Sequence, residues 1–132
     1  MNFLTMKKDI KNSTDIKWMV DHFYDKIKDD RVVGFIFTEV MQVNWQKHLP
    51  IMYAFWENAL FYTGGYNGNA IKKHISMSRF IPLQKKYFTR WLQLFNQTVD
   101  EYFEGEKASL AKQRAHSIAT IMQIKIAEAT AK

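Results

Sequence analysis

The sequence predicts an all-α protein, and two observations support this prediction. Apolar residues recur at intervals of three and four in four long segments, which is the spacing that places side chains on one face of a helix. The apolar run at 32–37 also suits a strand by composition, but no partner strand is evident elsewhere. The chain of 132 residues fits a single domain, 1–132, with a leading arm at 1–12 and a fraying tail at 127–132.

The first helix is predicted over residues 15–28. Ser13 and Thr14 precede it with hydroxyls that suit an N-cap, and the charge of Asp15 suits the positive end of the helix dipole. Tyr24 falls on the apolar face, so its hydroxyl points inward and needs a partner, which is ordinarily a backbone group or water. The predicted inward face consists of Met19, Val20, Phe23, Tyr24 and Ile27.

Residues 32–37 are expected to form one or two helical turns that direct Phe37 into the core. The next helix is predicted over 43–62. Pro50 falls within it, and a proline inside a helix lacks an N–H and clashes with the preceding turn. The helix therefore either begins near His48 or is kinked there. Its apolar stripe is Trp45, His48, Met52, Phe55, Trp56 and Ala59.

A glycine-rich stretch follows at 64–69, ahead of a short predicted helix at 70–75 and an irregular connection at 76–82. Ile71 and His74 are three residues apart and share a face of the short helix. One interpretation is a loop followed by a surface histidine. The other is a glycine swivel that delivers one histidine between apolar helices to hold a metal cofactor.

Two further long helices are predicted over 83–103 and 107–128, with Gly105 as a C-cap of the first. The inward residues of the first are Phe88, Trp91, Leu92, Phe95, Val99, Tyr102 and Phe103. Those of the second are Ala111, Ala115, Ile118, Met122 and Ile126.

The composition excludes several classes of site. The chain has no cysteine, which rules out disulfides, thiolate metal sites, cysteine nucleophiles and covalently attached haem. No phosphate-binding loop, nucleophile elbow or zinc-ligand spacing is present, so hydrolytic chemistry is not expected. Aromatic residues make up 15% of the chain, which suits a flat organic cofactor but also a ligand-free aromatic core.

The net charge of +6 comes from lysines spread along the chain. We interpret them as solvated helix faces rather than a nucleic-acid surface. Residues 1–11 lack the apolar run of a secretory signal, and no segment has the length of a bilayer span. A cytoplasmic protein with no membrane partner is therefore expected.

Four polar or aromatic side chains on predicted apolar faces form the candidate site: Tyr24, His48, His74 and Trp91. Each is individually compatible with an ordinary core or rim position. Together they suit a haem site, because a single axial histidine leaves one coordination position of the iron open for a gas. The hydroxyl, imidazole and indole can donate hydrogen bonds to a bound, partly anionic O₂. His22 and His116 have polar neighbours and are expected at the surface.

The sequence resembles the truncated haemoglobins, and specifically their third group, from about Ile16 to Met122. Phe23-Tyr24 resembles the first-helix motif of the family, and His48-Leu49-Pro50 followed by Phe55-Trp56 resembles the distal-helix motif. Further similar segments are Tyr66-Asn67-Gly68-Asn69 ahead of Lys73-His74, the run from Phe88 to Phe95, Thr98-Val99-Asp100-Glu101, and Arg114-Ala115 with Ile118-Ala119.

The resemblance implies a two-over-two helical sandwich around haem b, with His74 as the axial iron ligand and Tyr24, His48 and Trp91 around the bound ligand. It also accounts for Pro50 as part of the distal motif. The implied haem contacts are Phe37, Met52, Phe55, Ile71, Phe80, Phe88, Ile118 and Met122. By charge, Arg79 and one of Lys72 and Lys73 could pair with the haem propionates, although solvated lysines are equally compatible.

Three functions remain open at this point. The first is reversible binding of O₂, CO or NO by a monomer or weak dimer. The second is NO dioxygenation or peroxide chemistry at the same site, which would require an external reductase because the sequence shows no reductase domain. The third is a cofactor-free basic helical interaction module.

Overall fold

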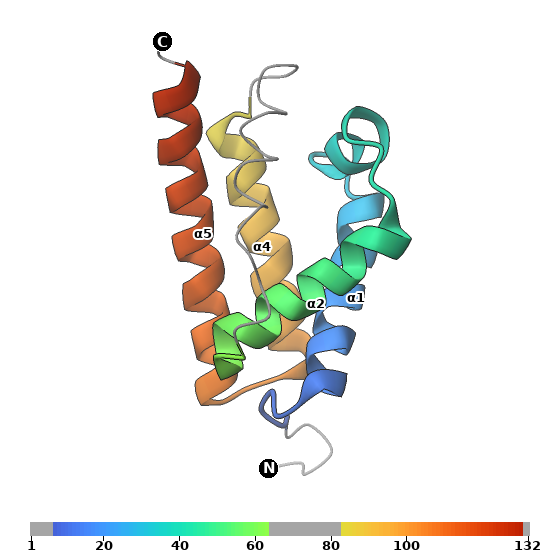
Figure 1. Ribbon diagram of the computed structural model, residues 1–132, viewed down its shortest axis with the longest axis vertical. Helices are drawn as coiled ribbons and strands as arrows, with labels where there is room; N and C mark the ends of the chain where they lie inside the picture. The colour runs from blue at the N-terminus through green and yellow to red at the C-terminus, as the bar shows by residue number, and fades with distance from the viewer. Residues whose placement is uncertain (1–6, 64–82, 131–132) are drawn as a thin grey trace.

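The computed structural model describes residues 7–63 and 83–130 of the chain (Figure 1). Within them, four long helices form the body: α1 (Ser13–Asp29), α2 (Trp45–Phe61), α4 (Lys85–Tyr102) and α5 (Glu106–Thr130). Helix α1 packs on α2 and α4, and α5 packs on α2 and α4. This is the predicted two-over-two arrangement, and the all-α prediction is confirmed. No helix within the described ranges has the length and apolarity needed to cross a membrane.

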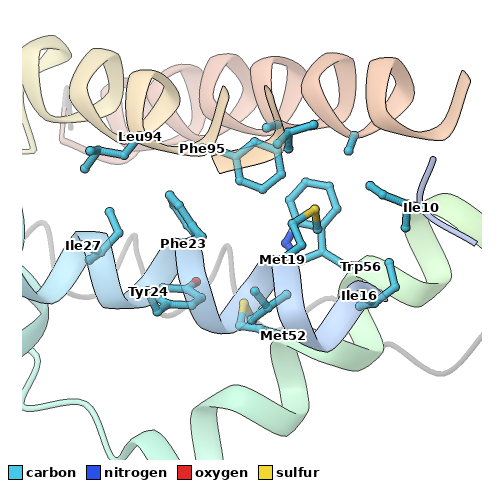
Figure 2. Packing of buried hydrophobic residues seen from close by; sticks show 14 of the residues in the cluster. Ile10, Ile16, Met19, Phe23, Tyr24, Ile27, Met52, Trp56, Leu94 and Phe95 are labelled. Carbon is cyan, nitrogen blue, oxygen red and sulfur yellow. The ribbon is translucent and has the colours of Figure 1, made fainter. Parts of the chain in front are cut away.

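Helix α1 begins two residues earlier than predicted. Its N-cap is Asn12, whose side chain accepts a hydrogen bond from the amide of Asp15 at 3.0 Å, so Ser13 and Thr14 lie inside the helix. All five residues predicted to face inward are buried: Met19, Val20, Phe23, Tyr24 and Ile27. Figure 2 shows Phe23 and Ile27 directed toward Leu94 and Phe95 of α4.

The turn that follows α1 packs closely against the last turn of that helix. Gly34 permits this, because a Cβ there would lie 2.9 Å from the carbonyl oxygens of Ile27 and Lys28. The turn leads into a π-helix, η2 (Ile36–Val40), where residues 32–37 were predicted to give one or two helical turns. Phe37 is buried, as predicted.

Helix α2 begins at Trp45 with Asn44 as its N-cap, which excludes the alternative that it begins near His48. Pro50 lies inside the helix and is exposed. The helix ends at Phe61, and Tyr62, with a left-handed backbone (φ 59°), is its C-cap. Lys107 of α5 donates to the carbonyl of Leu60 at 2.8 Å, which ties the end of α2 to the start of α5.

Residues 7–12, predicted to be part of a patternless arm, are anchored to the α4–α5 turn. Lys8 forms an isolated parallel bridge with Phe103, and Ile10 is buried. The carboxylate of Asp9 accepts hydrogen bonds from the amides of Lys107 (3.0 Å) and Ala108 (2.8 Å), so it caps the N-terminus of α5. Burial alone would raise the pKa of Asp9, but these hydrogen bonds, that from Ile10 and the Lys107 charge lower it.

Gly105 has a different role from the predicted C-cap of α4. The cap of α4 is Phe103, with extended backbone, and the carbonyl of Gly105 accepts the hydrogen bond of Ser109 at 2.9 Å in the first turn of α5. Its φ of 129° suits glycine alone. The helix that follows continues to Thr130, through the first residues of the predicted tail.

Candidate functional site

Tyr24 is the buried polar residue around which the candidate site is built. Its side chain is 5% exposed, and the centroid of its ring lies 5.3 Å from that of His48 and 6.1 Å from that of Phe37. No hydrogen bond to its hydroxyl forms among the described residues. Burial raises the pKa of Tyr24, so the phenol keeps its proton and remains a donor. Figure 2 shows Tyr24 near Met52, away from the α4 side of α1.

His48 lies in the first turn of α2, where its amide donates to the carbonyl of Asn44 at 2.8 Å. Its imidazole is half-buried and stands edge-on to the ring of Tyr24, at 82°. The structure thus brings together two of the three side chains that were expected around a ligand.

Trp91, the third of these, is half-buried on α4 and reaches the others indirectly. Its ring is edge-on to Phe23 at 5.5 Å and nearly parallel to Phe95 at 5.9 Å. Phe23 in turn contacts Tyr24 at 5.0 Å. Phe23 is therefore the aromatic link between Trp91 and Tyr24.

A buried carboxylate fastens this part of α4 to the end of α1. Asp30 accepts hydrogen bonds from Nε of Arg90 at 2.9 Å and from the amides of Val32 and Val33 at 3.0 and 3.1 Å. It also forms an ion pair with Nη2 of Arg90 at 2.7 Å. Burial would raise the pKa of Asp30, but these bonds and the charge of Arg90 lower it below the ordinary value. Since Arg90 precedes Trp91, the contact helps to fix where that indole stands relative to α1.

The other predicted contact residues within the described ranges lie on several elements. Phe37 of η2 and Met52 of α2 are buried in the main core, with half-buried Phe55 beside Trp56. Phe88 belongs to a smaller cluster between α4 and α5 with Ala119 and Ile126, against which Trp91 and Met122 pack. Ile118 of α5 is half-buried against the main core.

The remaining predicted site residues lie outside the described residues. They are His74, Ile71, Arg79, Phe80, Lys72 and Lys73, and the glycine stretch before them lies outside as well. The roles assigned to them therefore stay predictions.

Two residues of the site were not singled out from the sequence. Trp45 is half-buried and contacts the rings of Tyr24 (5.4 Å), Phe37 (6.4 Å) and His48 (5.7 Å). The ammonium of Lys28 lies 4.4 Å from the Trp45 ring centroid. Trp45 could have been found from the sequence, because it is three residues before His48 on the same apolar stripe. Lys28 could not, because its contact with Trp45 joins two different helices.

The two histidines set aside in the sequence differ in exposure. His116 is exposed, as predicted. His22 is half-buried, stacks on Trp18 at 3.7 Å and has its Nδ1 2.7 Å from the Trp18 carbonyl oxygen. Across residues 7–63 and 83–130, no group of three His, Asp or Glu side chains is arranged to hold a metal ion.

Comparison with known proteins identifies the family. The chain is 30% identical over 121 residues to the protein named Group 3 truncated hemoglobin ctb from Campylobacter jejuni, and the match covers 89% of this chain and 93% of that protein. The chain belongs to the group 3 truncated haemoglobins. The crystal structure of group III truncated hemoglobin from Campylobacter jejuni superposes with a TM-score of 0.79 at 29% identity, covering 92% of this chain and 95% of that one. No family model matches the sequence.

As a truncated haemoglobin, the chain is a globin-type haem protein, and the described residues fit such a group. The Tyr24 side chain is buried, and its hydroxyl makes no hydrogen bond among these residues, so the hydroxyl can donate to a ligand. Large apolar side chains from three helices, Phe55, Trp91 and Met122, are only half-buried. A flat apolar molecule would cover such surfaces.

Proposed function

We propose that this truncated haemoglobin binds haem b through His74 and reversibly binds O₂, CO or NO beside Tyr24. The observation that supports this most strongly is the buried Tyr24 side chain, whose hydroxyl makes no hydrogen bond among the described residues and whose ring stands edge-on to that of His48. Haem, when bound, would supply an iron that can bind a diatomic gas.

Tyr24 serves as the hydrogen-bond donor in this proposal. Burial raises the pKa of its phenol, so the donated proton is present at all physiological pH values. His48 contacts Tyr24 and stands half-buried at the first turn of α2, where it can either donate to a ligand or turn toward solvent. Trp91 is the third donor, held by Phe23 and by the Asp30–Arg90 contact next to it.

The apolar residues would enclose the haem. Phe37, Met52, Phe55, Phe88, Ile118 and Met122 would form these contacts from η2, α2, α4 and α5, with Ile71 and Phe80. Arg79, with Lys72 or Lys73, would pair with propionates by charge.

The first test is absorption spectroscopy of the full chain reconstituted with haem. We expect a Soret band that shifts when CO is added to the ferrous protein. His74→Ala should lose most of the bound haem, whereas His116→Ala, which changes an exposed histidine, should retain it. A colourless protein that binds DNA with strong salt dependence would refute the proposal in favour of a cofactor-free module.

The second test addresses the donor. Tyr24→Phe removes only the hydroxyl, and one donated hydrogen bond is worth about 0.5–1.5 kcal/mol. Dissociation of O₂ should therefore become roughly two- to tenfold faster. Tyr53→Phe is the matched control, because its hydroxyl donates to Asp21 between α1 and α2. An unchanged rate in Tyr24→Phe would transfer the donor role to His48 or Trp91.

The same polar corner favours a second candidate function. Tyr24 and His48, with Trp91 beyond Phe23, offer up to three donors that could polarise an O–O bond, as NO dioxygenation or peroxide reduction requires. Such turnover needs electrons from an external reductase. Sustained NO consumption with a reductase and NADH, lost in Tyr24→Phe, would support this function over binding alone.

A further inference from the structure

Trp45 covers one side of the corner formed by Tyr24 and His48. Its indole contacts Tyr24 at 5.4 Å and His48 at 5.7 Å, and it lies nearly parallel to Phe37, at 25°. Tyr24 and Phe37 are buried, whereas Trp45 is half-buried. The indole is thus the layer between solvent and the buried phenol on this side.

The backbone before Trp45 is short and closely held. The amide of Met41 donates to the carbonyl of Ile36 at 2.8 Å, and that of Val43 donates to the carbonyl of Phe37 at 3.0 Å. Gln42 between them has a left-handed backbone, with φ 49°. Trp45 is the first residue of α2, so its Cα is fixed while its side chain extends across the corner.

Lys28 holds the indole from the opposite helix. Its ammonium lies 4.4 Å from the centroid of the Trp45 ring, well within the range of a cation–π contact. Lys28 follows Tyr24 by one helical turn on α1, so the two side chains lie on the same side of that helix. The lysine side chain is 34% exposed, which places this contact at the solvent boundary.

We propose that Trp45 and Lys28 form a latch over the distal corner and that the indole controls the access of a diatomic ligand to Tyr24 and His48. The proposal rests on the haem function proposed above. With the latch closed, the indole fills the space beside both polar side chains. Opening requires the indole to leave Lys28 as well as the aromatic rings beneath it.

The lysine contact sets how often the latch opens. A cation–π contact near the surface corresponds to a roughly two- to fivefold change in the ratio of closed to open forms. Lys28→Met should therefore raise the CO association rate roughly two- to fivefold. Trp45→Ala removes the indole itself and should raise the CO association rate further. Trp45→Phe keeps a smaller ring and should give an intermediate rate.

The test measures CO rebinding after flash photolysis of the haem-loaded full chain. Lys26→Met is the matched control, since it removes the same charge from the same helix but from a lysine that pairs with Glu101 and lies over Tyr102. Lys28→Met should have no further effect in a Trp45→Ala background, because the two residues act through one contact.

A second readout does not depend on haem. The chain has four tryptophans, so 5-fluorotryptophan labelling should give four ¹⁹F resonances in the haem-free protein. The resonance that Trp45→Phe removes should shift in Lys28→Met and stay in place in Lys26→Met.

Distinct results would overturn the two proposals. A protein that takes up no haem would remove the haem function and the latch with it. A protein that binds CO normally, but at the same rate in Lys28→Met as in Lys26→Met, would refute the latch alone. The latch would also be refuted if Lys28→Met and Trp45→Ala changed the CO association rate by factors that multiply in the double variant.

Discussion

Replacing Asp30 with alanine should destabilise the protein by about 3 kcal/mol. The carboxylate is 6% exposed and accepts two amide hydrogen bonds as well as the guanidinium of Arg90. A hydrogen bond to a charged group contributes about 1.5–3 kcal/mol, while the ion pair adds less because Arg90 is 37% exposed. The sum is a large share of the 5–15 kcal/mol that stabilises a typical domain.

Urea unfolding followed by circular dichroism measures this loss, with haem occupancy matched between variants because bound ligand adds to stability. With an m-value of about 1.5–2 kcal/mol/M, the midpoint should fall by roughly 1.5–2 M. Asp30→Asn should cost about half as much, since the amide oxygen still accepts from Val32 and Val33. Arg90→Met should cost about 1 kcal/mol.

The pH dependence gives an independent check. The folded-state pKa of Asp30 is lowered, so its contribution is complete above the ordinary value of about 4 and is lost as pH falls below it. The difference in stability between wild type and Asp30→Ala should therefore shrink from pH 6 toward pH 3. If Asp30→Ala shifts the urea midpoint no more than Arg90→Met, the capping of the turn after α1 has been misjudged.

Three further predictions concern the α4–α5 turn and the α1–α2 contact. Asp9→Ala should cost about 1–2 kcal/mol in urea unfolding, because the first-turn amides of α5 lose their acceptor. Gly105→Ala should cost about 1–3 kcal/mol, since the new Cβ would lie 2.6 Å from the Asp9 Cγ. The double variant of Gly105→Ala with Asp9→Ala should therefore lose less stability than the sum of the two single variants, and additive losses would exclude that clash. Burial, with the hydrogen bond to Asp21 and its charge, raises the pKa of Tyr53 to about 12. Absorbance at 295 nm should lose that late titration in Tyr53→Phe, and the stability that this tyrosine contributes should decline as pH rises from about 10 toward 12; a profile unchanged by the substitution would contradict it.

The helices could be predicted because their stripes are local. On α1 the spacing of Met19, Phe23 and Ile27 alone identifies the buried face, and the structure confirms each residue. The cap of the same helix was misplaced because three adjacent polar residues, Asn12, Ser13 and Thr14, all suit an N-cap. Only the direction of the backbone decides between them.

The contacts of the leading arm could not be predicted from local pattern. The carboxylate of Asp9 meets amides almost a hundred positions further along, at Lys107 and Ala108. Gly105 was assigned to the helix before it because local pattern is ambiguous there: a glycine between two helices suits the end of one or the start of the next.

In the candidate site too, local pattern predicted some features, whereas contacts between distant segments could not be predicted. Tyr24 and His48 were expected together, and the structure places their rings side by side. That Phe23 links Tyr24 to Trp91 follows from the packing of α1 on α4, which the stripes do not specify. The Lys28–Trp45 contact depends in addition on the π-turn of η2, which sets where α2 begins.

The carboxylate cap of α5 has a consequence for biosynthesis. Asp9 leaves the ribosome before its partner Lys107, which is 98 positions further along the chain. At about 5–20 residues per second, the arm waits roughly 5–20 s before its partner has been made. During that time the carboxylate of Asp9 lacks the amides of Lys107 and Ala108 that hold it in the finished protein. The contact that anchors Asp9 to α5 therefore forms only after synthesis has reached the first turn of α5.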